Sequence, residues 1–200
     1  MAAMTPLDLT CHPASPAPVP LGVRVGLERS GSLLTLLWRV QADPASIVWP
    51  APQPAGPADG LWQHTCFEAF IRRDDGSPGY TEFNFSPSGQ WACYRFAAER
   101  ERESENQRED GSAPAAARPH APVLRFQPLI DGAQLVAQLT LPDPPDDDHP
   151  GWRIGLTAVV ETAGGPLCWW ALHHPAPRPD FHHPGGHVLR LPADRPLRSF

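Results

Sequence analysis

The residues that could bind or transform a small molecule form two groups, and the first consists of polar and aromatic side chains within apolar segments. An extended strand points alternate side chains to opposite sides. By that alternation, one side of residues 61–72 (LWQHTCFEAFIR) and of residues 80–86 (YTEFNFS) carries Trp62, His64, Glu68, Glu82 and Asn84. An indole covers the apolar C–H face of a sugar, while carboxylates and amides bind its hydroxyls. The group predicts a carbohydrate site, and a solvated outer sheet face with a stray tryptophan is the alternative.

The second group lies near the end of the chain, where five of the nine histidines fall within fifteen residues. Its candidate site residues are Trp169, Trp170, His173, Asp180 and His182. The pair Asp180 and His182 could be two metal ligands, or a carboxylate that orients an imidazole for acid–base chemistry. Prolines at positions 175, 177, 179 and 184 favour an ordered extended loop, in which the histidines only form hydrogen bonds.

Several familiar kinds of chemistry are excluded by what the sequence lacks. All 16 basic residues are arginine, which removes mechanisms that need a lysine amine, such as Schiff bases or a P-loop phosphate contact. There is no G-x-S-x-G, G-x-G-x-x-G or H-E-x-x-H motif. The four cysteines are widely spaced, so they predict buried thiols rather than a zinc site. We therefore expect no cofactor and no catalytic residue, with a divalent metal or haem as alternatives; methionine occurs only at positions 1 and 4, so haem would need histidine ligands alone.

Charge and hydropathy narrow the partners. The net charge of −6 argues against nucleic-acid binding, which would require a basic stripe. No apolar stretch is long enough to span a bilayer, and residues 1–20 lack the features of a secretory signal. The expected partner is a sugar-like small molecule, not a nucleic acid or a membrane, and the expected location is cytoplasmic.

The segments that must position these residues are short and rich in β-formers. Proline accounts for 27 of the 200 residues, which leaves little room for long helices. Ten or more short strand-like segments are separated by turn signals. The sequence predicts one all-β domain over residues 1–200, an antiparallel β-sandwich of jelly-roll or immunoglobulin-like type with little helix.

The clearest hairpin runs from Tyr80 to Phe96 around the turn Pro87-Ser88-Gly89. A three-residue loop pairs Phe85 with Trp91 and Glu82 with Tyr94, whereas a four-residue loop pairs Glu82 with Arg95. The first register is preferred, because it gathers the apolar residues on one face.

Two segments resemble insertions. Residues 98–121 begin with the charged run ERERESENQRED and continue into an Ala/Pro-rich stretch, which predicts a solvated loop with at most a turn or two of helix near Glu99–Gln107. Residues 141–150 carry four aspartates among prolines. An acidic loop is favoured over a calcium site there, because the turn glycine and the closing glutamate of such a site are missing.

Three strings carry a family resemblance: LWQHTCFEAFI, YTEFNFSPSGQWACYRF and the ending WALxHP…PDFHH. Over roughly Leu7 to Leu191 the chain resembles a bacterial subgroup of the DOMON-like domains, which are related to family-nine carbohydrate-binding modules. The resemblance implies an antiparallel β-sandwich and a sugar or haem ligand. In the carbohydrate modules two tryptophans hold a terminal sugar. By position, Trp62 and either Trp169 or Trp170 would be that clamp, with Glu68, Glu82 and Asn84 as hydroxyl partners.

Three functions follow as hypotheses. The first is a non-enzymatic β-sandwich that binds a carbohydrate or a related small polar molecule. The second is a small hydrolase or isomerase that uses Glu68 and Glu82, or Asp180 and His182, for proton transfer. The third is a haem-binding DOMON-type module.

Overall fold

The structure is a computed structural model, and it describes residues 4–103, 121–141 and 151–192. This part of the chain is nearly all β, with helix limited to short 3-10 turns at Pro44–Ser46 (η1), Leu61–Gln63 (η2) and Pro184–Gly186 (η4). The predicted all-β fold is confirmed. The strands are β1 (Leu7–Cys11), β2 (Leu21–Ser30), β3 (Leu33–Ala42), β4 (Gly56–Pro57), β5 (Cys66–Arg73), β6 (Tyr80–Phe85), β7 (Gln90–Ala98), β8 (Glu101–Arg102), β9 (Val123–Leu129), β10 (Gly132–Thr140), β11 (Trp152–Glu161), β12 (Leu167–Ala171) and β13 (Leu189–Leu191).

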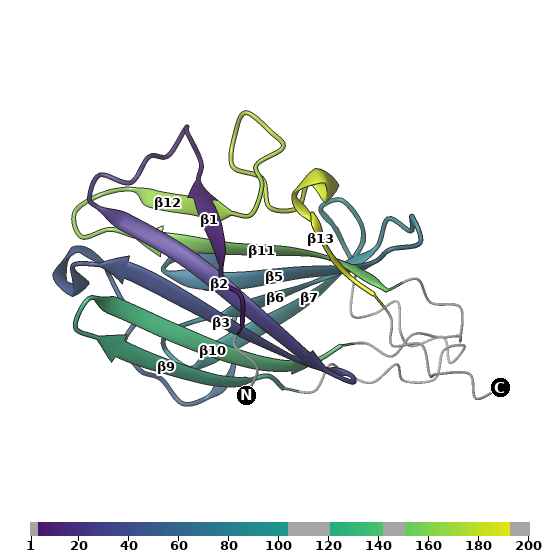
Figure 1. Cartoon of the computed structure of the whole chain (residues 1–200), viewed down its shortest axis with the longest axis horizontal. Coiled ribbons are helices and arrows are strands. Elements are labelled where there is room, and N and C mark those ends of the chain that lie inside the picture. The colour runs from purple at the N-terminus through teal and green to yellow at the C-terminus, as the bar shows by residue number, and fades with distance from the viewer. Residues whose placement is uncertain (1–3, 104–120, 142–150, 193–200) are drawn as a thin grey trace.

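The strands form two layers that share one strand (Figure 1). The first layer has the order β1-β2-β3-β10-β9, and the second has the order β4-β7-β6-β5-β11-β12-β1, with β8 beside β7 and β13 beside β11. Strand β1 passes from one to the other, because Leu7–Leu9 pair with β2 while Thr10 and Cys11 pair with β12. Pairing is antiparallel except between β4 and β7, which run parallel. The result is a curled, sandwich-like fold.

The main core fills the space between the two layers. Trp38 on β3 is fully buried, and its ring centroid lies 5.6 Å from that of Phe67 and 5.7 Å from that of Phe85 on the opposite layer. Alternation along β5 and β6 sends Phe67 and Phe85 inward and leaves Glu68 and Glu82 on the outer face of the second layer. The predicted division of side chains between the two strand faces is confirmed for these strands.

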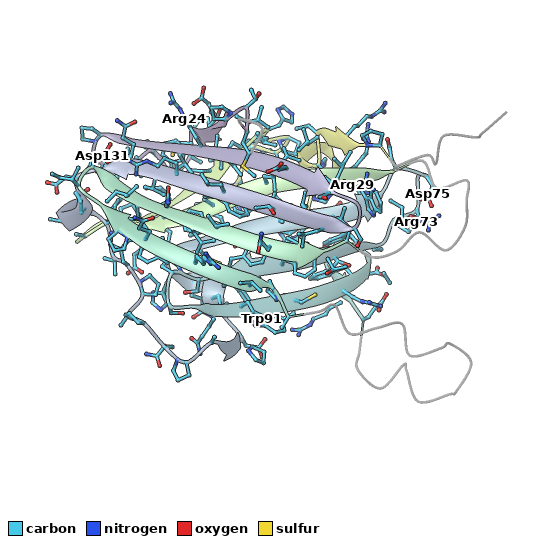
Figure 2. The ribbon with its side chains drawn as sticks, turned by 60° about the horizontal axis from the view of Figure 1, so that its bottom comes forward. Arg24, Arg29, Arg73, Asp75, Trp91 and Asp131 are labelled. Atoms are coloured by element: carbon cyan, nitrogen blue, oxygen red, sulfur yellow. The ribbon has the colours of Figure 1, made fainter. Side chains whose placement is uncertain are left out.

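The outer face of the first layer is polar. It faces the viewer in Figure 2, with Arg24 and Asp131 toward one end. Arg24 forms an exposed ion pair with Asp8 at 2.7 Å. Such surface pairs add little to stability, so this layer depends on its buried face.

The hairpin between β6 and β7 has the predicted three-residue loop. The Ser86 amide donates to the Gln90 carbonyl at 2.9 Å. Phe85 lies opposite Trp91 and Glu82 lies opposite Tyr94, which confirms the register. Gly89 takes a φ of 92°, a conformation that favours glycine and closes the turn.

One local prediction was wrong. Residues 61–72 are not extended throughout, because Gly60 is left-handed (φ 72°) and Leu61–Gln63 form η2, so β5 begins only at Cys66. Trp62 therefore does not share the strand face of Glu68. The start of the 98–121 insertion contains no helix: Arg100 has a positive φ of 60° and β8 pairs with β7. The rest of that insertion (104–120) and the acidic residues 142–150 lie outside the described residues.

No helix in the described part of the chain is long and apolar enough to cross a membrane.

Candidate functional site

A cavity of about 340 Å³ lies on the outer face of the second layer. Strands β5, β6 and β7 form its floor through Phe70, Glu68, Glu82, Tyr94 and Phe96. Its walls come from four other parts of the chain: Trp62 on η2, Trp169 on β12, Arg100 and Arg102 at β8, and residues 179–182. Segments distant in sequence thus meet around one hollow.

A second aromatic cluster attaches the segment that contains the wall residues 179–182 to the sheet. Phe70 is buried, stacks on His187 with ring centroids 5.5 Å apart, and contacts Phe181 at 6.3 Å. The chain can approach this closely because position 155 is glycine: a Cβ there would lie 2.7 Å from Cδ2 of His187. We call residues 172–188 the covering segment.

The two wall tryptophans are more exposed than Trp170, which lies in the core. Trp62 is 37% exposed and packs edge-on against Tyr94 at 5.8 Å. Trp169 is half-buried and packs against Phe181 at 5.3 Å. Trp170 points the other way into the main core, as alternation along β12 requires. Of the two tryptophans that the sequence left open, the structure places Trp169 at the cavity.

Two buried carboxyl groups lie at the floor of the cavity. Glu68 is 2% exposed; its Oε2 accepts a hydrogen bond from Thr157 Oγ1 at 3.3 Å. Its Oε1 is buried and has no hydrogen-bond partner among the described residues. Glu82 Oε1 accepts from Asn84 Nδ2 at 2.7 Å. Burial raises the pKa of both carboxyls, and the charge of Glu82 raises the pKa of Glu68 further.

The Glu68→Gln variant is expected to be more stable than the wild type at pH 7 to 8. A carboxyl whose pKa is raised on folding holds its proton more tightly in the folded state, so stability falls as pH rises above the unfolded value of 4.5. Glutamine removes that loss. Chemical denaturation at pH 5 and pH 8 measures it, with Glu28→Gln at an exposed position of β2 as the control. If the stability of the variant keeps the pH dependence of the wild type, the pKa of the Glu68 carboxyl is not raised in the folded protein.

The ring of His182 is oriented by Tyr80. The Tyr80 hydroxyl accepts from the Arg100 backbone amide at 3.2 Å and shares a hydrogen bond with His182 Nδ1 at 2.7 Å. The other ring nitrogen, His182 Nε2, lies 3.9 Å from Glu82 Oε2. Burial, and next the Arg100 guanidinium, lower the pKa of His182 to about 4, so the imidazole is neutral at pH 7.

Asp180 does not orient the His182 ring, as one sequence hypothesis required. Its Oδ1 instead accepts from the backbone amide of His182 at 3.1 Å and from Arg100 Nη2 at 2.8 Å. The carboxylate therefore shapes the loop and holds a guanidinium at the rim.

Three predicted site residues, together with Trp170, do not line the cavity. His64 is exposed and pairs with Glu161 at 2.8 Å. Asn84 is fully buried and supports Glu82 from below. His173 lines a separate hollow of about 560 Å³.

The hollow beside His173 does not resemble a metal site. Two other histidines line it: His12 Nε2 contacts the Ala176 carbonyl at 3.1 Å, and His174 Nε2 contacts the Thr10 carbonyl at 2.8 Å. Within residues 4–103, 121–141 and 151–192, no three histidine, cysteine or acidic side chains are arranged to hold a metal ion.

Sequence reasoning missed several residues of the site. Tyr94 donates its hydroxyl proton to Asp59 at 2.7 Å, and the Arg102 guanidinium lies 4.0 Å above its ring. The predicted pairing of Tyr94 with Glu82 could have placed it there. Arg100 and Arg102 belong to a charged run that predicted a solvated loop. The sequence did not indicate Phe181 as a site residue, because its position depends on how the covering segment packs against the sheet.

Comparison with known proteins identifies the fold. No protein-family model and no curated protein matches the chain. A candidate carbohydrate-binding protein from Bacteroides uniformis is 14% identical, with 92% of this chain and 84% of that chain covered and a TM-score of 0.54. A family-nine carbohydrate-binding module from Caldicellulosiruptor kristjanssonii, solved with cellotriose, is 10% identical, with 82% and 71% covered and a TM-score of 0.50. The chain shares the fold of these proteins.

Proposed function

We propose that this protein is a non-enzymatic binding domain whose cavity holds a carbohydrate. One observation carries the proposal: Trp62 and Trp169 line the same cavity as the buried carboxyls of Glu68 and Glu82. Aromatic faces suit the apolar side of a sugar ring, and carboxyl oxygens accept hydrogen bonds from its hydroxyls. No cofactor is needed for this role.

The charged rim supplies the complementary donors. Arg100 and Arg102 line the rim of the cavity and carry guanidinium N–H donors, and a sugar hydroxyl both donates and accepts. At about 340 Å³ the cavity is near the lower end of the range for ligand pockets, which suits one or two sugar rings. The family-nine neighbour, solved with cellotriose, supports the same class of ligand. We also propose that this chain belongs to the DOMON-like group.

Alanine at either wall tryptophan is expected to weaken sugar binding about tenfold or more, corresponding to about 1.4 kcal/mol. Trp62→Ala should cost little folding stability, since the ring is 37% exposed. Calorimetric titration with a panel of neutral mono- and disaccharides measures the affinity, and thermal melting measures the stability.

Trp49→Ala is the matched control for these variants. Trp49 is half-buried and packs against Phe126 at 5.3 Å, away from the residues that line the cavity. It should lose stability while sugar affinity stays unchanged. Unchanged affinity in both Trp62→Ala and Trp169→Ala would overturn the proposed site. Release of reducing sugar during the titration would favour the hydrolase hypothesis instead.

A further inference from the structure

We propose that the floor of this cavity selects a sugar bearing an ammonium group over the matching neutral sugar. The inference rests on the proposed function and adds a ligand class to it. It starts from an unpartnered oxygen, from the placement of the nearby cations and from the aromatic walls.

The unpartnered oxygen is Oε1 of Glu68. The side chain is at least nine-tenths buried, lines the cavity and has one hydrogen bond, from Thr157 to Oε2 at 3.3 Å. A carboxylate has room for about four hydrogen bonds. A buried acceptor with no partner is costly, so a donor supplied by a ligand at this position would be strongly favoured.

The cations near the cavity are directed elsewhere. Arg100 is held by Asp180 at 2.8 Å, and Arg102 lies over the Tyr94 ring at 4.0 Å. Both guanidinium groups lower the pKa of Glu82, whereas burial and the charge of Glu82 raise the pKa of Glu68. His182 is neutral at pH 7. Within the described part of the chain, Glu68 therefore faces another acid and no counter-ion.

The aromatic lining of the cavity also suits a cation. Trp62, Trp169, Tyr94, Phe70 and Phe96 surround the cavity, and aromatic faces attract ammonium groups within about 6 Å. An ammonium group has three N–H donors and a positive charge, whereas the hydroxyl that it replaces has one O–H donor and no charge. Its bonds to carboxylates are charge-assisted and about twice as strong as neutral ones. The same aromatic rings cover the C–H face of the sugar.

Matched pairs of sugars test this inference by calorimetric titration at pH 6.5, where sugar amines are protonated. The pairs are glucose and glucosamine, galactose and galactosamine, and mannose and mannosamine, with N-acetylglucosamine as a form whose nitrogen is uncharged. At least one amino sugar should bind tenfold or more tightly than its neutral parent, and acetylation should remove that advantage.

The Glu68→Gln variant removes the group that can carry a negative charge and keeps the shape. It should reduce the preference for the amino sugar to twofold or less, because the affinity for the amino sugar falls by a larger factor than the affinity for the neutral parent. Glu161→Gln is the matched control, because Glu161 pairs with exposed His64 and does not line the cavity. Circular dichroism of both variants verifies folding.

The outcomes separate this inference from the proposed function. Neutral sugars that bind as tightly as amino sugars, with a loss of affinity in Trp62→Ala, would overturn the ammonium selectivity and leave the sugar site standing. Ethanolamine bound as tightly as glucosamine would overturn the sugar site. A protein that binds none of these probes would overturn both.

Discussion

The Phe70→Ala variant is expected to lose about 3–5 kcal/mol of folding stability, the usual cost of emptying a buried aromatic site, and to lose its ligand response. Phe70 is 1% exposed and stands between the sheet and the covering segment. Its ring contacts those of Tyr80, Phe181, His182 and His187. Without it, the covering segment loses a buried aromatic contact with the sheet. Chemical denaturation measures the stability, and a sugar titration measures the response.

Phe126→Ala separates loss of the site from loss of stability alone. Phe126 on β9 is half-buried against Trp49 in the first layer, and it does not line the cavity. Its removal should lower stability by a smaller amount and leave ligand affinity unchanged. A loss below about 1 kcal/mol in Phe70→Ala would show that the covering segment is held by other contacts.

The floor of the cavity could be predicted from the sequence because strand alternation and a tight turn are local properties. Phe83 and Phe85 must face one way if Glu82 and Asn84 face the other. The turn at Gly89 then fixes which residue of β7 lies opposite each residue of β6. The side shared by Glu68 and Glu82 follows from the chain itself.

The walls could be predicted only in part, because they depend on contacts between distant segments. Trp62 reaches the cavity from η2, which follows Gly60 in a left-handed conformation. Strand alternation does not predict that turn. His182 was singled out for its type, but its ring partner is Tyr80, 102 positions away. Asp180, two residues from His182, was the expected partner because sequence reasoning favours near neighbours.

The prediction for Arg100 and Arg102 was incomplete for a physical reason. Arg100 and Arg102 lie in a run of charges, which ordinarily indicates a solvated face. Both side chains are exposed, as that interpretation requires, yet they also border the cavity. A guanidinium can serve both roles, since its stem and planar head contact a ring while its N–H groups remain in water.

Folding stability is expected to fall by about 2 kcal/mol per buried histidine when pH drops from 7 to 5. Burial lowers the pKa of His182 and of His187 to about 4, from an ordinary value of 6.5. Below pH 6.5 these histidines bind protons in the unfolded chain but remain neutral in the folded chain. Their contribution to the free energy of unfolding is therefore complete above pH 6.5 and is lost as pH falls toward 4. His187 is 1% exposed, and its Nε2 proton is directed at the Phe181 carbonyl at 3.2 Å.

Two non-titrating variants, each made in a Glu68→Gln background, test this. That background removes the opposite trend of the Glu68 carboxyl, whose raised pKa makes stability fall as pH rises. His182→Asn keeps an acceptor for the Tyr80 hydroxyl, and His187→Gln keeps a donor for the Phe181 carbonyl. Each should shrink the difference in unfolding free energy between pH 7 and pH 5 by about 2 kcal/mol.

A packing loss in either variant cancels, because the measured quantity is a difference between two pH values within one protein. His173→Gln, at an exposed position outside the cavity, should keep the difference of the Glu68→Gln background. If His187→Gln also keeps that difference, the ring is not held neutral between Phe70 and Gly155. The covering segment would then pack more loosely than the structure requires, and the walls of the sugar site would lack a rigid base.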